Sequence, residues 1–140
     1  MIVYLVRHAR AGSREDWAGD DRLRPLDERG RRQAEALVDQ LAGRDLGRIL
    51  SSPYVRCVDS VVPLAGSRSL TVEADEALAE GAGADAALDL FHGTEGPLVA
   101  CVHGDLAEEL LGHNLKKGAT AVLELSASRV EVRERLDPPA

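Results

Sequence analysis

Two short apolar runs, residues 2–6 and 98–102, place the strongest constraint on how this chain folds. Such runs, rich in aliphatic and β-branched residues, are typical of strands buried in the centre of a sheet. Each run ends abruptly in polar residues that include a histidine: Arg7-His8 after the first and His103-Gly104 after the second. Because ligands bind at the carboxyl ends of strands in open α/β sheets, these endings are candidate functional residues.

Segments with strand and helix patterns alternate through most of the 140 residues. Strands are predicted at 2–6, 48–52, 70–73 and 98–102, helices between Asp27 and Gly43 and at 54–65, 85–92 and 105–111, and an antiparallel hairpin at 121–125 and 129–133. This alternation predicts an α/β fold, a three-layer α/β/α sandwich with a mainly parallel, mixed central sheet. We expect one domain over residues 1–136, followed by a frayed tail at 137–140.

Details of the connecting segments add further expectations. The helix at 54–65 is expected to end early at Pro63 and to turn these residues inward: Val55, Val58, Val62 and Leu64-Ala65. Asp27 and Asp105 are expected to cap their helices. The polar segment 9–27 and the glycine-rich segment 74–84 are long for connections, and loops of such length are usually functional. We expect them to set specificity.

Composition and charge exclude several classes of partner. The net charge is −7 and aromatic residues make up 3%, which argues against nucleic acid polymers and membrane surfaces. The run at 2–6 is too short for a signal peptide or a membrane span. Cys57 and Cys101 lie in apolar settings without C-x-x-C spacing. They are expected to be reduced core thiols, which favours a cytoplasmic location.

Three strand ends carry polar groups that suit an anion. They are Arg7-His8, then Ser51-Ser52-Pro53 with Arg56 one helical turn further on, and His103-Gly104. If these strands are neighbours in a parallel sheet, all three sets converge at one crevice. Two guanidiniums and two imidazoles around one point repel each other unless an anion joins them, and a phosphoryl group is the obvious one.

The segments LVRHA, SSPYVR and VHG occur in this order along the chain. Together they resemble the histidine phosphatase superfamily and imply its phosphoglycerate mutase-like fold. The short chain and the R-P-L-D-x-x-G segment, Arg24 to Gly30, are similar to its small SixA-like branch. The same region also resembles the phosphatase domain fused to Nudix hydrolases, which leaves open whether the chain works alone or with a Nudix-type partner.

The resemblance implies a role for each candidate residue. His8 would be the nucleophile and form a phosphohistidine, with no metal or other cofactor, while Arg7, Arg56 and His103 hold the phosphoryl oxygens. The substrate-binding residues expected on this basis are Arg7, Arg56, His103, Gly104 and Asp21. Glu80 is the first candidate for the proton donor, and Asp21 is the reserve.

Three functions stay open at this point. The first is a metal-independent phosphatase acting on a small phosphorylated metabolite, a nucleotide or a phosphohistidine protein. The second is a phosphoglycerate mutase, for which the chain is short of insertions. The third is a non-catalytic phosphate-binding or regulatory module. Arg22 or Arg24 could contact a polyanionic substrate.

Overall fold

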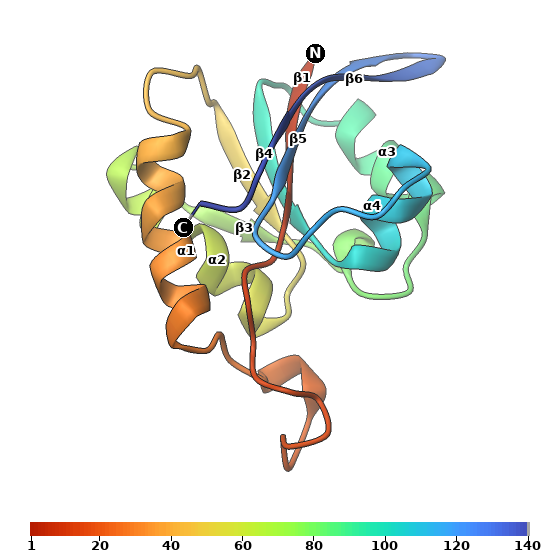
Figure 1. Cartoon of the computed structure of the whole chain (residues 1–140). Coiled ribbons are helices and arrows are strands. Elements are labelled where there is room, and N and C mark those ends of the chain that lie inside the picture. Colours follow the sequence, from red (N-terminus) through yellow and green to blue (C-terminus); the bar gives the residue numbers. More distant parts are fainter. Residues whose placement is uncertain (140) are drawn as a thin grey trace.

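A computed structural model describes residues 1–139 and contains one six-stranded mixed sheet (Figure 1). The strands are β1 Ile2–Arg7, β2 Arg48–Ser51, β3 Val72–Ala74, β4 Leu98–Val102, β5 Thr120–Ser126 and β6 Arg129–Leu136. Their order is β3-β2-β4-β1-β5-β6. The first four strands in this order are parallel to one another, β5 is antiparallel to β1, and β6 is antiparallel to β5. The predicted mixed sheet and terminal hairpin are confirmed.

Four helices cover the sheet: α1 Glu28–Gln40, α2 Val55–Ser67, α3 Ala84–His92 and α4 Gly104–Leu111. Two short 3-10 turns, η1 Asp21–Leu23 and η2 Glu76–Leu78, lie in the two long connections. Alternate residues of β4 face opposite layers, since Val99 and Cys101 pack with α1 and α2 whereas Ala100 and Val102 pack with α3 and α4. The predicted three-layer α/β/α sandwich is therefore confirmed.

The sheet order explains why distant motifs meet. Strand β4 lies between β2 and β1 and is parallel to both. Arg7 pairs with Val102, and Ser51 pairs with Cys101, so the three strands end at the same level. Carboxyl ends of neighbouring parallel strands share one edge, and the predicted convergence follows from this register.

Helix α2 differs from its prediction in length and in the face that it buries. It continues past Pro63 to Ser67, and Val62 is 47% exposed. Leu64 and Ala65 are buried as predicted, and Val55 and Val58 are partly buried. The rest of the buried face consists of Arg56, Cys57, Ser60 and Val61. The prediction chose Val62 and left out its neighbour Val61, which is fully buried. The error is one of phase, because the packed stripe includes Val61 and not Val62.

The predicted helix caps have two outcomes. Asp27 caps α1, because its carboxylate accepts a hydrogen bond of 2.7 Å from the Gly30 N–H. Asp105 is not the cap of α4; it lies in the first turn, and His103 occupies the cap position without a side-chain bond. The third strand also begins two residues later than predicted, at Val72.

Within residues 1–139 no helix has the length and apolar character to span a membrane.

Candidate active site

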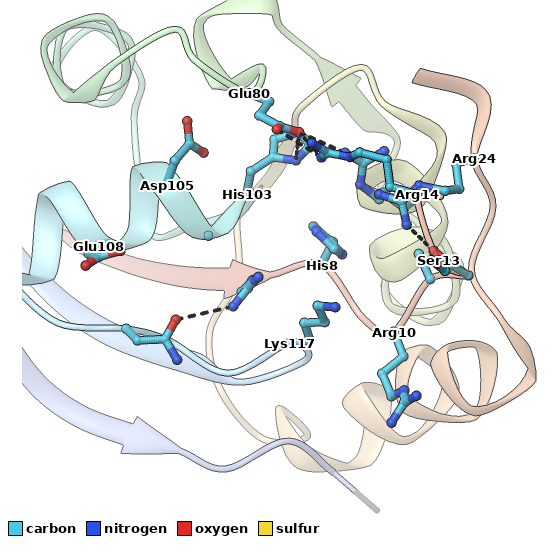
Figure 2. Close-up of a pocket in the computed structure, with 16 residues that line it drawn as sticks. His8, Arg10, Ser13, Arg14, Arg24, Glu80, His103, Asp105, Glu108 and Lys117 are labelled. Carbon is cyan, nitrogen blue, oxygen red and sulfur yellow. Dashed lines mark hydrogen bonds and ion pairs between the residues drawn. The ribbon is translucent and has the colours of Figure 1, made fainter. Parts of the chain in front are cut away.

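The ends of β1 and β4, together with the start of α2, open into a cavity of ≈ 760 Å³ (Figure 2). Six of the seven residues singled out from the sequence line it: Arg7, His8, Arg56, Glu80, His103 and Gly104. The seventh, Asp21, is not on the wall, but its carboxylate accepts a hydrogen bond from Arg56. Residues from two strand ends, helix α2 and two long loops therefore meet at one cavity, whereas Ser51 and Ser52 after β2 are fully buried and do not line it.

His8 follows β1 directly and is only 6% exposed. Its Nδ1–H donates to the carbonyl oxygen of Ala9 at 2.8 Å, which fixes the tautomer with the lone pair on Nε2. Burial lowers the pKa of His8 to about 3, helped by the positive charges of Arg56 and Arg7 and by His103, against the Ala9 hydrogen bond. The imidazole is therefore neutral at physiological pH and presents an unprotonated nitrogen.

Arg7 extends from the end of β1 along the start of α4. Its Nη1 donates to the Leu115 carbonyl at 2.8 Å, and burial lowers its pKa, partly offset by Asp105. A Cβ atom on Gly104 would lie 2.7 Å from Arg7 Cζ. Only glycine allows the guanidinium to lie this close to the helix backbone.

Arg56 is 1% exposed and is held by two carboxylates. Its Nη2 donates to Asp21 Oδ2 at 3.0 Å and to Glu80 Oε2 at 2.9 Å, and its Nη1 donates to the Asp21 carbonyl at 2.8 Å. A buried guanidinium requires such partners, since an unpaired charge in the interior is costly. The paired carboxylates explain how a core helix position accommodates arginine.

His103 lies at the start of α4 and is 2% exposed. Ser52 Oγ accepts a hydrogen bond from the Tyr54 N–H and lies 2.8 Å from His103 Nε2, so the hydroxyl hydrogen can be donated to Nε2. This arrangement leaves the proton of His103 on Nδ1, which lies 3.7 Å from Glu80 Oε2. The Ser-Ser-Pro segment thus orients this histidine.

Glu80 and Asp21 hold different positions although both contact Arg56. Glu80 lines the cavity and accepts hydrogen bonds of 3.0 and 3.1 Å from Arg14. Asp21 accepts a hydrogen bond of 2.9 Å from Arg24 Nε. Burial opposes the charged form of Asp21, but hydrogen bonds from Arg24 and Arg56, with the charges of Arg56 and Arg14, outweigh it and lower the pKa of Asp21.

The cavity also contains residues that sequence reasoning did not select. They are Arg10, Arg14, Asn114 and Lys117, joined by Asp105 and Glu108. The arginine-rich composition of 9–27 was the available signal for the first two, whereas Lys117 lies in a short turn without a motif. Of the two arginines considered for a polyanion, Arg24 lines the cavity, and Arg22 instead pairs with Glu76 at 2.6 Å.

Hydrogen-bond donors without acceptors gather around His8. Among residues 1–139, five buried side-chain nitrogen or oxygen atoms have no partner, and three belong to cavity residues: Arg7 Nε, Arg56 Nε and His103 Nδ1. Buried donors normally find an acceptor, so this cluster is unusual. Nowhere in this range do three or more His, Cys, Asp or Glu side chains gather as metal ligands would. The arrangement suits an oxyanion.

The family model of the histidine phosphatase superfamily (branch 1) matches residues 3–89 of this chain. The chain belongs to the histidine phosphatase superfamily. The matched range includes the segments that carry His8, Arg56 and Glu80.

The other comparisons agree with this family. An 8-oxo-(d)GTP phosphatase of Mycolicibacterium smegmatis is 34% identical to this chain over an alignment of 155 positions, which includes 98% of this chain. The chain spans about half (48%) of that relative's length. In fold, the chain is similar to a proposed phosphohistidine phosphatase, SixA, from Agrobacterium tumefaciens, with TM-score 0.77, 24% identity and coverage of 98% and 97% of the two chains. A SixA structure complexed with tungstate gives TM-score 0.73, 21% identity and coverage of 99% and 97%.

Proposed function

We propose that this domain hydrolyses a phosphomonoester or phosphoramidate without a metal, through a phosphohistidine intermediate on His8. One observation carries the proposal: His8 is a buried, neutral imidazole whose Nδ1–H is fixed on the Ala9 carbonyl, so that Nε2 keeps its lone pair in a cationic cavity. A nucleophile in phosphoryl transfer needs this combination of a free lone pair and positive surroundings.

In the first half-reaction, the Nε2 lone pair of His8 attacks phosphorus and forms a P–N bond while the bond to the leaving oxygen or nitrogen breaks. Arg7, Arg56 and His103 supply the donors for the phosphoryl oxygens, and Gly104 gives Arg7 the space to do so. Donors already oriented toward the developing charge stabilise the transition state more than the ground state.

In the second half-reaction, water attacks the phosphohistidine, the P–N bond breaks, and inorganic phosphate leaves. A carboxyl group protonates the leaving atom in the first step and removes a proton from water in the second. Glu80 is the proposed carboxyl group, because it lines the cavity, whereas Asp21 has its oxygens directed to Arg24 and Arg56.

The central test is covalent labelling in the presence of a chelator. We expect wild-type protein to hydrolyse p-nitrophenyl phosphate in EDTA and to give an acid-labile, base-stable phosphoenzyme in rapid quench. His8→Ala removes the nucleophile and is expected to abolish both. His92→Ala, at the exposed end of α3, is the matched control and retains both. Labelled His8→Ala protein, or turnover close to that of wild type, would refute the role of His8.

The products separate the alternative functions. Release of inorganic phosphate supports a phosphatase, whereas an isomerised ester would support a phosphoglycerate mutase. Orthophosphate or tungstate binding without turnover of any substrate would support a non-catalytic phosphate-binding module.

Leaving-group dependence tests which carboxyl group is the proton donor. Nitrophenolate departs without a proton, so Glu80→Gln is expected to lower kcat for an alkyl phosphate by about 10²–10⁴ and kcat for p-nitrophenyl phosphate far less. Asp21→Asn weakens the contact with Arg56 and should lower both rates alike. A loss selective for alkyl phosphate in Asp21→Asn would instead identify Asp21 as the donor.

We propose a small phosphorylated metabolite or a phosphohistidine protein as the substrate, and one feature favours a nucleotide as a second candidate. A smaller hollow of ≈ 260 Å³ contains Trp17 and shares Gly12, Ser13 and Arg24 with the main cavity. An indole can stack on a nucleobase. The Mycolicibacterium relative named for 8-oxo-(d)GTP supports the same class. A screen of nucleotides, sugar phosphates and phosphohistidine protein tests it.

A further inference from the structure

The cavity contains more positive charge than one phosphoryl group needs. Besides Arg7 and Arg56, its lining includes Arg10, Arg14, Arg24 and Lys117. Arg14 is paired with Glu80, and Arg24 binds Asp21 and the Gly12 carbonyl. Lys117 forms no ion pair with any residue in 1–139, and Arg10 has one contact of 3.6 Å, to Asp27. Arg7 likewise forms no ion pair within this range, and its Nη1 donates to the Leu115 carbonyl. Besides Arg7, two of the six cations are therefore weakly neutralised or not neutralised.

Lys117 and Arg10 lie on the side of His8 away from Glu80 and His103 (Figure 2). Their charges affect each other: burial lowers the pKa of Lys117, the positive charges of Arg7, Arg10 and Arg24 lower it further, and Asp27 partly offsets them. Like charges held together cost free energy unless an anion binds between them.

The backbone fixes both residues to the end of β1. The Gly118 N–H, next to Lys117, donates to the carbonyls of Arg7 at 3.1 Å and His8 at 3.0 Å. Gln33 Oε1 accepts the Arg10 N–H at 3.0 Å and would lie 3.2 Å from a Cβ on Gly118, whose φ is +84°. The turn with Lys117 and the segment with Arg10 are therefore packed on the same glutamine, beside the proposed nucleophile.

We propose that Lys117 and Arg10 form a second anion subsite, which binds another phosphoryl group of the substrate. The inference rests on the proposed function, which assigns the transferred phosphoryl group to Arg7, Arg56 and His103. A second phosphoryl group neutralises the two remaining cations and gains charge-assisted hydrogen bonds. The site then selects compounds with two phosphoryl groups over simple phosphomonoesters.

Selectivity is measured as the ratio of kcat/KM for a two-phosphoryl substrate to that for its one-phosphoryl counterpart. GDP with GMP tests a phosphoanhydride, and adenosine 3′,5′-bisphosphate with AMP tests two separate esters. We expect Lys117→Met to lower at least one ratio by about tenfold, the size of one charge-assisted contact. The ratio that falls identifies the source of the second phosphoryl group. Unchanged ratios in both pairs overturn the proposal.

Lys116→Met is the matched control, because Lys116 is exposed, lies in the same turn, carries the same charge and does not line the cavity. Its ratios should equal those of wild type. An equal fall in Lys116→Met would attribute the effect to net charge and would also overturn the proposal.

A binding measurement separates failure of the subsite from failure of the proposed function. By calorimetry, Lys117→Met should weaken pyrophosphate binding about tenfold more than orthophosphate binding. If this difference is present in a protein that hydrolyses nothing, the subsite stands and the proposed catalysis fails. If both anions weaken equally while wild-type protein is active, the catalysis stands and the subsite fails.

Discussion

The neutral state of His8 makes stability depend on pH in a way that can be worked out from the structure. The folded protein holds the pKa of His8 at about 3, against 6.5 in an unfolded chain, because burial disfavours the imidazolium. Between these two values the unfolded state binds a proton that the folded state does not. The contribution of His8 to the free energy of unfolding is therefore fully present above pH 6.5 and is lost as the pH falls toward 3.

Replacing His8 by asparagine removes this titration. Integrating the linkage relation from about pH 7.5 to about pH 5 gives the contribution of His8 to the pH dependence. In wild-type protein it lowers the free energy of unfolding by about 2 kcal/mol, and His8→Asn lacks this loss. The lowered pKa values of Asp21 and Glu73 also make stability fall in acid, and both proteins share their contribution. The difference between the two proteins isolates His8.

Urea unfolding at the two pH values measures this difference. We expect the free energy of unfolding to fall by about 2 kcal/mol more in wild type than in His8→Asn, and His92→Asn to follow wild type. In wild-type protein the His8 Cε1 NMR resonance should not titrate between about pH 5 and 8. Parallel stability profiles for wild type and His8→Asn, or a His8 resonance that titrates near neutrality, would refute a buried neutral nucleophile.

Three substitutions test other packing arguments. In Gly104→Ala the new methyl group displaces the Arg7 guanidinium. Orthophosphate affinity measured by calorimetry should therefore fall about tenfold or more, and an affinity equal to that of wild type would contradict the argument. In Gly30→Ala the methyl group meets the Arg10 carbonyl oxygen. Urea unfolding should show a loss of about 3 kcal/mol or more in the free energy of unfolding, and a loss below about 1 kcal/mol would contradict the clash. Val62→Ser, at an exposed position, should change stability by less than about 0.5 kcal/mol, and a core-sized loss would restore the inward prediction.

The fold was predictable because its sequence signals are local and consistent. The apolar runs of β1 and β4, the Asp27 cap and the left-handed Gly112 at the end of α4 each indicate one structure. Helix α2 was harder, since Val62 and Val61 are identical in chemistry and only packing against the sheet distinguishes them. A periodicity argument needs a starting position, which this valine-rich helix does not supply.

The site was predictable where motifs end strands, and not where long-range contacts decide. Arg7, His8 and His103 follow apolar runs, so sheet topology alone brings them together. Lys117 reaches the cavity because Gly118 hydrogen-bonds to the end of β1, a contact between residues more than a hundred positions apart. No pattern in the 113–119 turn indicates it.

The carboxylates beside Arg56 bear on how the proposed cycle ends. A cavity with only unpaired guanidiniums would bind the phosphate groups of substrate and product tightly, and tight binding of the ground state does not raise kcat. Asp21 and Glu80 share the Arg56 Nη2 donor and leave its Nε without an acceptor. An arriving phosphoryl group finds Nε free but must compete with these carboxylates for Nη2. The competition weakens ground-state binding and favours release of phosphate, so two of the acidic residues that make the net charge −7 also serve the cationic site.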